Sequence, residues 1–180
     1  GREYTDFMCI TIGTGIGCGI VTGGRVYHGG MNTAGELGHI SVEKDGIACP
    51  CGNKGCLERY ASGNAIFEHA FALNPEAFNG LPHRCETVFA LARKGNQEML
   101  GVIEKSVDYL AFGLANAVAI LSPQAILISG GLSVHHDLLI KPLTDRIYHY
   151  GYYSWTVRKM LRVLPAALGK HAPMIGAAFL

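Results

Sequence analysis

An α/β fold is predicted for this chain of 180 residues, and three features of the sequence carry that prediction. Short apolar runs bounded by glycine come first, a long helical repeat of apolar residues follows, and another short apolar run comes directly after it. Hydrophobic residues make up 49% of the chain and charged residues 16%, so a substantial core can form. At this length one domain is expected.

The first third is expected to form strands and turns, because glycine is concentrated between residues 13 and 63. The runs 7–12 and 18–22 are rich in residues that favour strands, and the glycines between them predict a hairpin. A Gly-Gly pair then predicts a second turn, with the next antiparallel strand at 25–27.

The remainder is expected to alternate helices with strands. Apolar residues recur every three or four positions from Gln97 to Leu121, which predicts one long helix that Pro123 ends. The run 125–129 has the pattern of a strand buried on both faces. The expected later elements are helices at 63–72, 86–94, 97–121 and 138–150, strands at 125–129 and 160–164, and a terminal helix from Pro173.

Charge and cysteine usage exclude several classes of protein. A formal net charge of +1 disfavours a nucleic-acid-coating or membrane-surface role, since both depend on excess basic residues. The longest apolar window, 109–121, is shorter than the roughly 20 residues of a membrane-spanning helix, so no such segment is expected. Three of six cysteines crowd into residues 49–56 and two lie in strand-like runs, which predicts reduced thiols in a cytoplasmic protein rather than a disulfide framework.

The cysteine cluster predicts a metal site. Cys49, Cys51 and Cys56 offer three thiolates and His39 offers an imidazole, the donor set of a closed structural zinc site. The alternative is a group of neighbouring thiols without metal, for which a polar loop rich in glycine gives little packing reason. A nucleic-acid-binding zinc finger is disfavoured, because the three basic residues between 39 and 59 are balanced by three acidic ones.

Two glycine-rich segments are candidates for nucleotide binding. The first, 11–19, lacks the Lys-Ser/Thr of a Walker loop and precedes a strand rather than a helix, so it predicts a phosphate-binding hairpin or simply a tight turn. The second, Ser129-Gly130-Gly131, follows the buried strand and predicts a nucleoside slot or an ordinary turn. The candidate residues are Gly13, Thr14, Gly15, Gly17, Gly130 and Gly131.

Taken together, these motifs resemble the ROK family of bacterial sugar kinases and sugar-responsive repressors. The hairpin 11–19, the stretch 34–39 (AGELGH), the run 49–58 and the Ser-Gly-Gly at 129–131 match in order and spacing, as does the closing stretch 165–178. The resemblance implies an actin-like ATPase fold (ribonuclease H-like, hexokinase type). It also implies that residues 1–180 form its larger, C-terminal half, a single domain with a zinc-binding loop at about 39–58.

The resemblance further implies that Glu36, His39 and Glu58 hydrogen-bond the hydroxyls of a hexose or N-acetylhexosamine, with His39 also on zinc. ATP with Mg²⁺ is the implied nucleotide. Such kinases carry an Asp-x-Gly-x-Thr phosphate loop and a general-base Asp ahead of this segment, and neither occurs in these residues. We therefore expect no catalytic residue here and no activity from this N-terminally incomplete chain alone.

Three functions remain open at this point. One is the sugar- and nucleotide-binding half of a glucokinase-like enzyme that phosphorylates the 6-hydroxyl, and another is the effector-binding half of a repressor. The third is a zinc-stabilised binding module with no sugar ligand. A homodimer is expected, because helix 97–121 is apolar on more than one side and ROK proteins commonly pair through this half. The domain's own core is the alternative cover. No functional role is expected for Cys9, Cys18 or Cys85, and no membrane or nucleic-acid partner for this segment.

Overall fold

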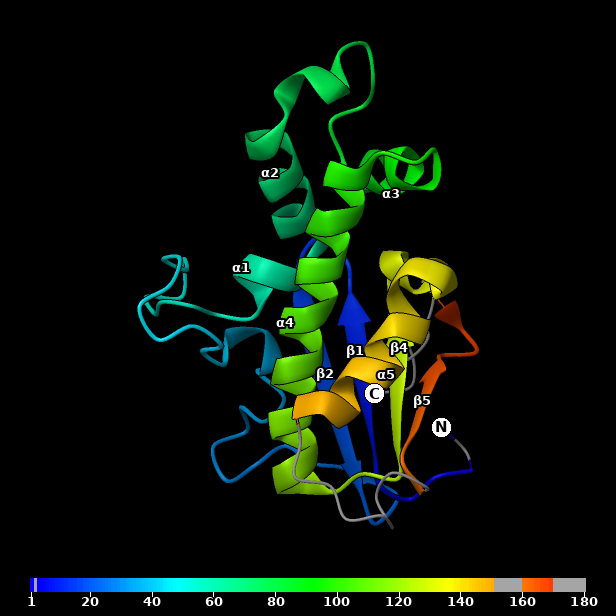
Figure 1. Cartoon of the computed structure of the whole chain (residues 1–180). Helices are drawn as coiled ribbons and strands as arrows, with labels where there is room; N and C mark the ends of the chain where they lie inside the picture. The colour runs from blue at the N-terminus through cyan, green and yellow to red at the C-terminus, as the bar shows by residue number, and fades with distance from the viewer. Residues whose placement is uncertain (2, 151–159, 170–180) are drawn as a thin grey trace.

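The computed structural model describes residues 1, 3–150 and 160–169. Within these residues a mixed sheet of five strands has the order β3-β2-β1-β4-β5 (Figure 1). Strand β1 pairs antiparallel with β2 and parallel with β4, which in turn pairs parallel with β5. The expected α/β fold is confirmed. The strands are β1 (Phe7–Ile12), β2 (Ile16–Thr22), β3 (Arg25–Val26), β4 (Ala125–Ser129) and β5 (Arg162–Pro165).

The first hairpin is tighter than expected. Ile12 pairs with Ile16, so only residues 13–15 form the loop, and the Gly13 N–H donates to the Gly15 carbonyl at 3.0 Å. Strand β2 therefore begins two residues before the expected start. Gly17, a candidate loop residue, lies inside β2 opposite Thr11.

Helix α4 (Gln97–Leu121) has the bounds that its apolar repeat predicts. The Asn96 side chain accepts a hydrogen bond from the Met99 N–H at 3.1 Å and so caps its start. Ser122 adopts a left-handed conformation at its end, directly before Pro123. The helix lies along one face of the sheet, with α5 (Lys141–Tyr150) on the same side (Figure 1). The core between them contains buried side chains from both layers, among them Met8, Ile10, Ile12, Ile103, Leu110, Leu114 and Leu143.

Strand β4 is buried along its whole length, as its apolar run predicts. The helix expected at 138–150 is instead two segments, because Pro142 has no N–H and continuous α-helical hydrogen bonding cannot pass through it. A π-helical turn, η4 (His136–Ile140), precedes α5. The remaining helices are α1 (Glu58–Ala61), α2 (Gly63–Leu73) and α3 (Cys85–Arg93), with short 3-10 turns η1 (Leu37–His39), η2 (Pro75–Phe78) and η3 (Gly131–Val134).

Two expectations concern the ends and length of the helices. The terminal helix predicted from Pro173 lies outside the described residues. Among the helices that are described, none combines the length and apolar character that crossing a bilayer requires.

Candidate functional site

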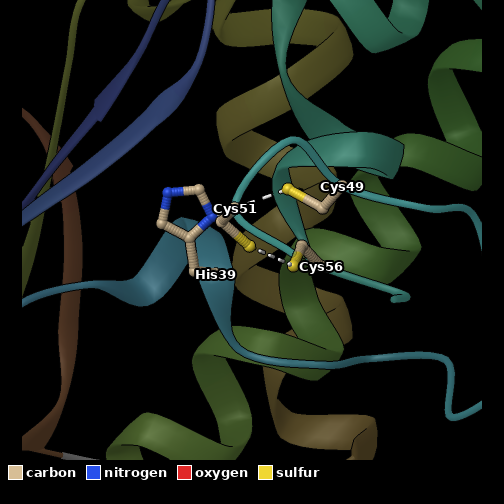
Figure 2. A group of neighbouring side chains, drawn as sticks. All are labelled: His39, Cys49, Cys51 and Cys56. Carbon is tan, nitrogen blue, oxygen red and sulfur yellow. Dashed lines mark hydrogen bonds between the residues drawn. The ribbon is translucent and has the colours of Figure 1, made fainter. Parts of the chain in front are cut away.

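The four expected metal ligands lie together beside α1 (Figure 2). One ring nitrogen of His39 and the Sγ atoms of Cys49, Cys51 and Cys56 are all within 4.8 Å of one another. Nδ1 of His39 is 3.7 Å from Sγ of Cys49, and the sulfurs of Cys51 and Cys56 are 3.6 Å apart. That sulfur separation is far longer than a disulfide bond of about 2.05 Å, and close to the roughly 3.8 Å between two thiolates on a tetrahedral zinc at about 2.3 Å each.

Backbone hydrogen bonds shape the loop that carries these ligands. The Cys49 N–H donates to the Asn53 carbonyl at 2.9 Å, and the Gly52 N–H donates back to Cys49 at 3.0 Å. Gly55 has a φ of +70°, and a Cβ there would lie 1.7 Å from the Glu43 carbonyl oxygen, so only glycine fits. These contacts close a tight loop, the knuckle of residues 49–56, in which all three sulfurs point to one place.

The chemistry of this donor set fits a soft divalent cation. Cys49 and Cys56 are buried and Cys51 is exposed, and all three are free thiols. Burial raises the pKa of the Cys56 thiol to about 12, and hydrogen bonds with its neighbouring thiols act in the same direction. The pKa of Cys51 is lowered, chiefly by the backbone N–H of Asn53. A bound zinc ion would hold such thiols as thiolates, because its charge outweighs the cost of burial.

Glu58 connects this knuckle to the glycine hairpin. It is the first residue of α1, two positions after Cys56, and its Oε2 accepts a hydrogen bond from the Ile16 N–H at 2.9 Å. A Cβ on Gly15 would lie 2.2 Å from the same oxygen, so the carboxylate rests directly on the hairpin backbone. One side chain therefore links two loops that are 42 residues apart in the sequence.

His39 is the last residue of η1 and Glu36 directly precedes this turn, which packs against β2. Gly38 makes this packing possible, since a Cβ there would lie 2.3 Å from the Ile16 carbonyl oxygen. Glu36 is exposed and lines a cavity of about 510 Å³ together with residues of β2 and α4, including Ile20 and Asn116. Among the described residues no side-chain hydrogen bond joins Glu36, His39 and Glu58 to one another. Of these three, only Glu58 is hydrogen-bonded to the hairpin, through the Ile16 N–H.

A second cavity, of about 240 Å³, brings the two glycine-rich segments together. Gly13 and Thr14 of the hairpin form part of its wall, and Gly131 and Leu132 of η3 form another part. Of the six candidate nucleotide-binding residues, Gly15, Gly17 and Gly130 are not in the lining. Gly130, with a φ of +88°, instead lets β4 end against β1, since its Cβ would lie 2.4 Å from the Ile12 carbonyl oxygen.

The rest of this cavity comes from residues that the sequence analysis did not single out. The N-terminal part of α2 supplies Gly63, Asn64 and Phe67, and the start of α3 with the two residues before it supplies His83, Arg84, Cys85 and Glu86. The Gly63 N–H donates to the Gly13 carbonyl at 2.8 Å, which fixes the start of α2 against the hairpin. Two helices thus begin at one cavity, and their N–H dipoles favour an anion there. The helix start at Gly63 was expected from the sequence, but nothing in the sequence showed that it meets the hairpin.

The three remaining cysteines take no part in the metal cluster. Cys85 lies at the first residue of α3 and lines the cavity, and burial raises the pKa of its thiol to about 12. Burial likewise raises the pKa of Cys18 to about 12. Thiols that stay protonated at neutral pH are poor nucleophiles.

Comparisons with known proteins identify relatives of this chain. A family model described as "ROK family" matches residues 1–180. A glucokinase from Streptomyces coelicolor is 32% identical, over 99% of this chain and 60% of its own length. The crystal structure of a ROK family glucokinase from Streptomyces griseus in complex with glucose and AMPPNP is 30% identical with a TM-score of 0.87, covering 98% of this chain and 60% of that one.

A regulator is also similar. The structure of a ROK family transcriptional regulator, a homologue of the E. coli MLC protein, has a TM-score of 0.82 and 30% identity, covering 98% of this chain and 46% of that chain. The chain spans about 60% of the length of the Streptomyces coelicolor glucokinase described above. The expected actin-like ATPase fold is confirmed by these neighbours. On the evidence of its motifs, its fold and a family match along its whole length, the chain belongs to the ROK family.

Proposed function

We propose that the protein containing this chain is an ATP-dependent hexose kinase of the glucokinase type, and that this chain supplies its sugar- and nucleotide-binding half. The observation that carries the proposal is the cavity where the Gly13-Thr14 hairpin meets Gly131 and two helix starts. Backbone N–H groups, a hydroxyl and helix dipoles around one small cavity suit the phosphates of ATP with Mg²⁺. A similar structure carries glucose and AMPPNP, which supports the same ligands here.

The sugar is proposed to lie near Glu58 and His39, where the zinc knuckle meets the hairpin. Glu58 already uses one carboxylate oxygen on the Ile16 N–H, which fixes the orientation of the group that would accept a sugar hydroxyl. Zinc on His39, Cys49, Cys51 and Cys56 would hold the imidazole tautomer and so leave its other nitrogen for the sugar. Glu36 is proposed as a third contact, although in this structure it faces the other cavity.

Phosphoryl transfer needs the two substrates to be held in line and a base for the attacking hydroxyl. The described residues would hold the two substrates in line, because Glu58 connects the proposed sugar site to the hairpin whose tip lines the nucleotide cavity. The base is proposed to belong to a part of the protein that this chain does not include. Transfer to the 6-hydroxyl of glucose or of an N-acetylhexosamine is the expected reaction.

A sugar-responsive repressor is the second candidate, favoured by the similarity to a ROK transcriptional regulator over 98% of this chain. Both candidates require sugar binding, and only the kinase requires ATP turnover. The distinguishing experiment measures sugar-dependent ADP formation by the full-length protein with glucose, N-acetylglucosamine and N-acetylmannosamine. Turnover supports the kinase, sugar binding without turnover supports the repressor, and neither activity contradicts both.

A variant sharpens the kinase assignment. Thr14→Val keeps the side-chain shape and removes a hydroxyl from the nucleotide cavity, so it should raise the KM for ATP and leave the KM for sugar unchanged. Thr144→Val, on α5, is the matched control, because its hydroxyl bonds only the Ile140 carbonyl at 3.0 Å. Equal effects of both variants would contradict a phosphate role for Thr14.

A homodimer in the cytoplasm is proposed as the working state. The core of the domain covers most of α4, since Ala115 is buried and Phe112 is half-buried, while Ile120 near its end is 82% exposed. Light scattering over a concentration series should give a constant molar mass of two chains. The variant Ile120→Glu should lower that mass to a single chain. A constant single-chain mass for the wild type would contradict the dimer.

A further inference from the structure

The segment that follows the nucleotide cavity is fastened to α3 by polar side chains. Arg93 of α3 donates from Nε and Nη2 to the two carboxylate oxygens of Asp137, at 3.1 and 2.6 Å, and from Nη1 to Nδ1 of His135 at 3.2 Å. The ring of His135 stacks on Phe89 of the same helix, with centroids 3.8 Å apart and planes 6° apart. An ion pair, a hydrogen bond and a ring stack therefore join α3 to residues 135–137.

The cavity wall includes residues of α3 and of η3, the turn that directly precedes residues 135–137. Helix α3 contributes Glu86, and η3 contributes Gly131 and Leu132. The His135 N–H donates to the Leu132 carbonyl at 3.1 Å, so the histidine lies one hydrogen-bonded turn behind the wall. We call Arg93, His135 and Asp137 the clamp, because they join α3 to the segment that follows η3 without lining the cavity themselves.

The protonation state of His135 matters to the clamp. The residue is 7% exposed, and within the part of the chain that the structure describes its buried Nε2 has no hydrogen-bond partner. A guanidinium can only donate, so Nδ1 accepts and the proton of the neutral ring lies on Nε2. A second proton would bind to Nδ1, and two hydrogen-bond donors, Nδ1–H and the Arg93 guanidinium, would then face each other.

The charges around the ring have opposing effects. Burial lowers the pKa of His135, the Arg93 cation lowers it further, and the carboxylates of Asp137 and Glu86 act in the opposite direction. Protonation would therefore place a buried cation beside the guanidinium and remove the acceptor that holds it.

We propose that Arg93, His135 and Asp137 are positioning residues for nucleotide binding, and that they hold the Gly131 wall in its binding geometry only while the His135 ring is neutral. The inference rests on the proposed nucleotide function of the cavity. None of the three residues lines the cavity itself, so their effect on ATP is transmitted through η3 and α3.

The test measures binding of AMPPNP with Mg²⁺ by calorimetry, in the full-length protein, at about pH 7.5 and at about pH 5. The lower value lies well below the ordinary histidine pKa because the pKa of His135 is itself lowered. His135→Phe keeps a ring against Phe89 and removes the acceptor, so it should weaken binding about three- to tenfold at both pH values. His135→Asn places an amide oxygen near the Nδ1 position and cannot titrate. It should bind within about twofold of the wild type at the higher pH and about three- to tenfold more tightly at the lower.

The matched control is His136→Asn, the same change at the next residue, which is exposed, and it should follow the wild type at both pH values. Phosphate groups also titrate near pH 6, so the decisive quantity is the ratio of affinities between wild type and His135→Asn. A ratio that does not change with pH overturns the requirement for a neutral ring.

Other outcomes separate this inference from the proposed function. Wild-type protein that binds no nucleotide at the higher pH refutes the proposed function and the clamp's role with it. Wild-type binding together with equal binding by His135→Phe refutes the clamp alone. If His135→Phe weakens sugar and nucleotide binding equally and lowers the melting temperature, the cluster is only structural and the positioning role is overturned.

Discussion

The proposed zinc loop (residues 39–58) and the proposed nucleotide cavity hold their functional groups by opposite means. In the described stretch 41–54, Cys49 is the only buried residue, so the loop has almost no core of its own. The cavity is built on helices and strand ends whose side chains belong to the main core, including Leu132 and Phe89. The loop therefore depends on ligand chemistry, whereas the cavity depends on packing.

This difference predicts how each region fails. Loss of one metal ligand should release a whole loop, because a structural zinc contributes on the order of 10–16 kcal/mol of apparent binding free energy and little else stabilises this segment. Loss of one cavity side chain should leave the fold intact and weaken one ligand. The predictions below test that contrast, beginning with the largest expected effect.

Cys56→Ser should abolish tight zinc binding and raise amide hydrogen exchange across residues 41–56, while α4 stays protected. Sugar binding should be lost with the loop, since Glu58 follows it directly. Elemental analysis should find one zinc per chain in the wild type and none in the variant. Cys85→Ala is the matched control and should keep its zinc. Wild-type protein without zinc, or with a disulfide between Cys49 and Cys56, would end this interpretation.

Glu58→Ala should raise the sugar Kd of the full-length protein at least about tenfold, because a hydrogen bond to a charged group is worth roughly 1.5–3 kcal/mol. Glu58→Gln, which keeps one acceptor oxygen, should lose less. Nucleotide affinity and zinc content should hardly change in either variant. Glu68→Ala, which removes an exposed carboxylate paired with Arg59, serves as control and should bind sugar normally. Unchanged sugar binding in Glu58→Ala would place the sugar pocket elsewhere.

A smaller effect is expected at the hairpin that Glu58 touches. Gly15→Ala adds a methyl group 2.2 Å from Oε2 of Glu58, so the carboxylate must shift and sugar affinity should fall about threefold to tenfold with zinc retained. Gly17→Ala is the control, since a Cβ there meets nothing within 4 Å. Sugar titrations of the two variants should therefore differ. Equal affinities would mean that the contact between Glu58 and the hairpin has no role in binding.

The same contrast explains what the sequence could predict. The four candidate metal ligands lie together in the structure, and the spacing of the three cysteines predicted that they would, whereas spacing alone said least about His39. The strand β4 and helix α4 were predictable because their apolar periodicity reflects burial directly. The glycines of the two loops were also recognisable, yet spacing could not tell that Gly17 belongs to a strand whereas Gly13 lines a cavity.

The residues missed by sequence analysis lie where distant segments meet. The starts of α2 and α3 join the hairpin only through tertiary contacts, and a capped helix start looks alike in any context. The hydrogen bond from Ile16 to Glu58 spans 42 positions and leaves no local pattern. The clamp of Arg93, His135 and Asp137 is another such case, because its partners lie on separate elements.

The smallest effects are expected at the cysteines that belong to neither region. Cys9 and Cys18 are half-buried in strands and Cys85 is buried at the start of α3. Since burial raises the pKa of Cys18 and of Cys85 to about 12, both thiols stay protonated as the pH rises through the neutral range, and iodoacetamide should label them slowly in the native protein.

Replacing each of the three cysteines by Ala removes only a small buried group, so the free energy of unfolding should fall by about 1 kcal/mol or less. Zinc content, sugar affinity and nucleotide affinity should match the wild type, even for Cys85, which lines the nucleotide cavity. A variant that loses zinc would mean that its sulfur replaces one of the four assigned ligands, and selective loss of nucleotide binding in Cys85→Ala would mean that the cavity wall requires a thiol rather than any small side chain.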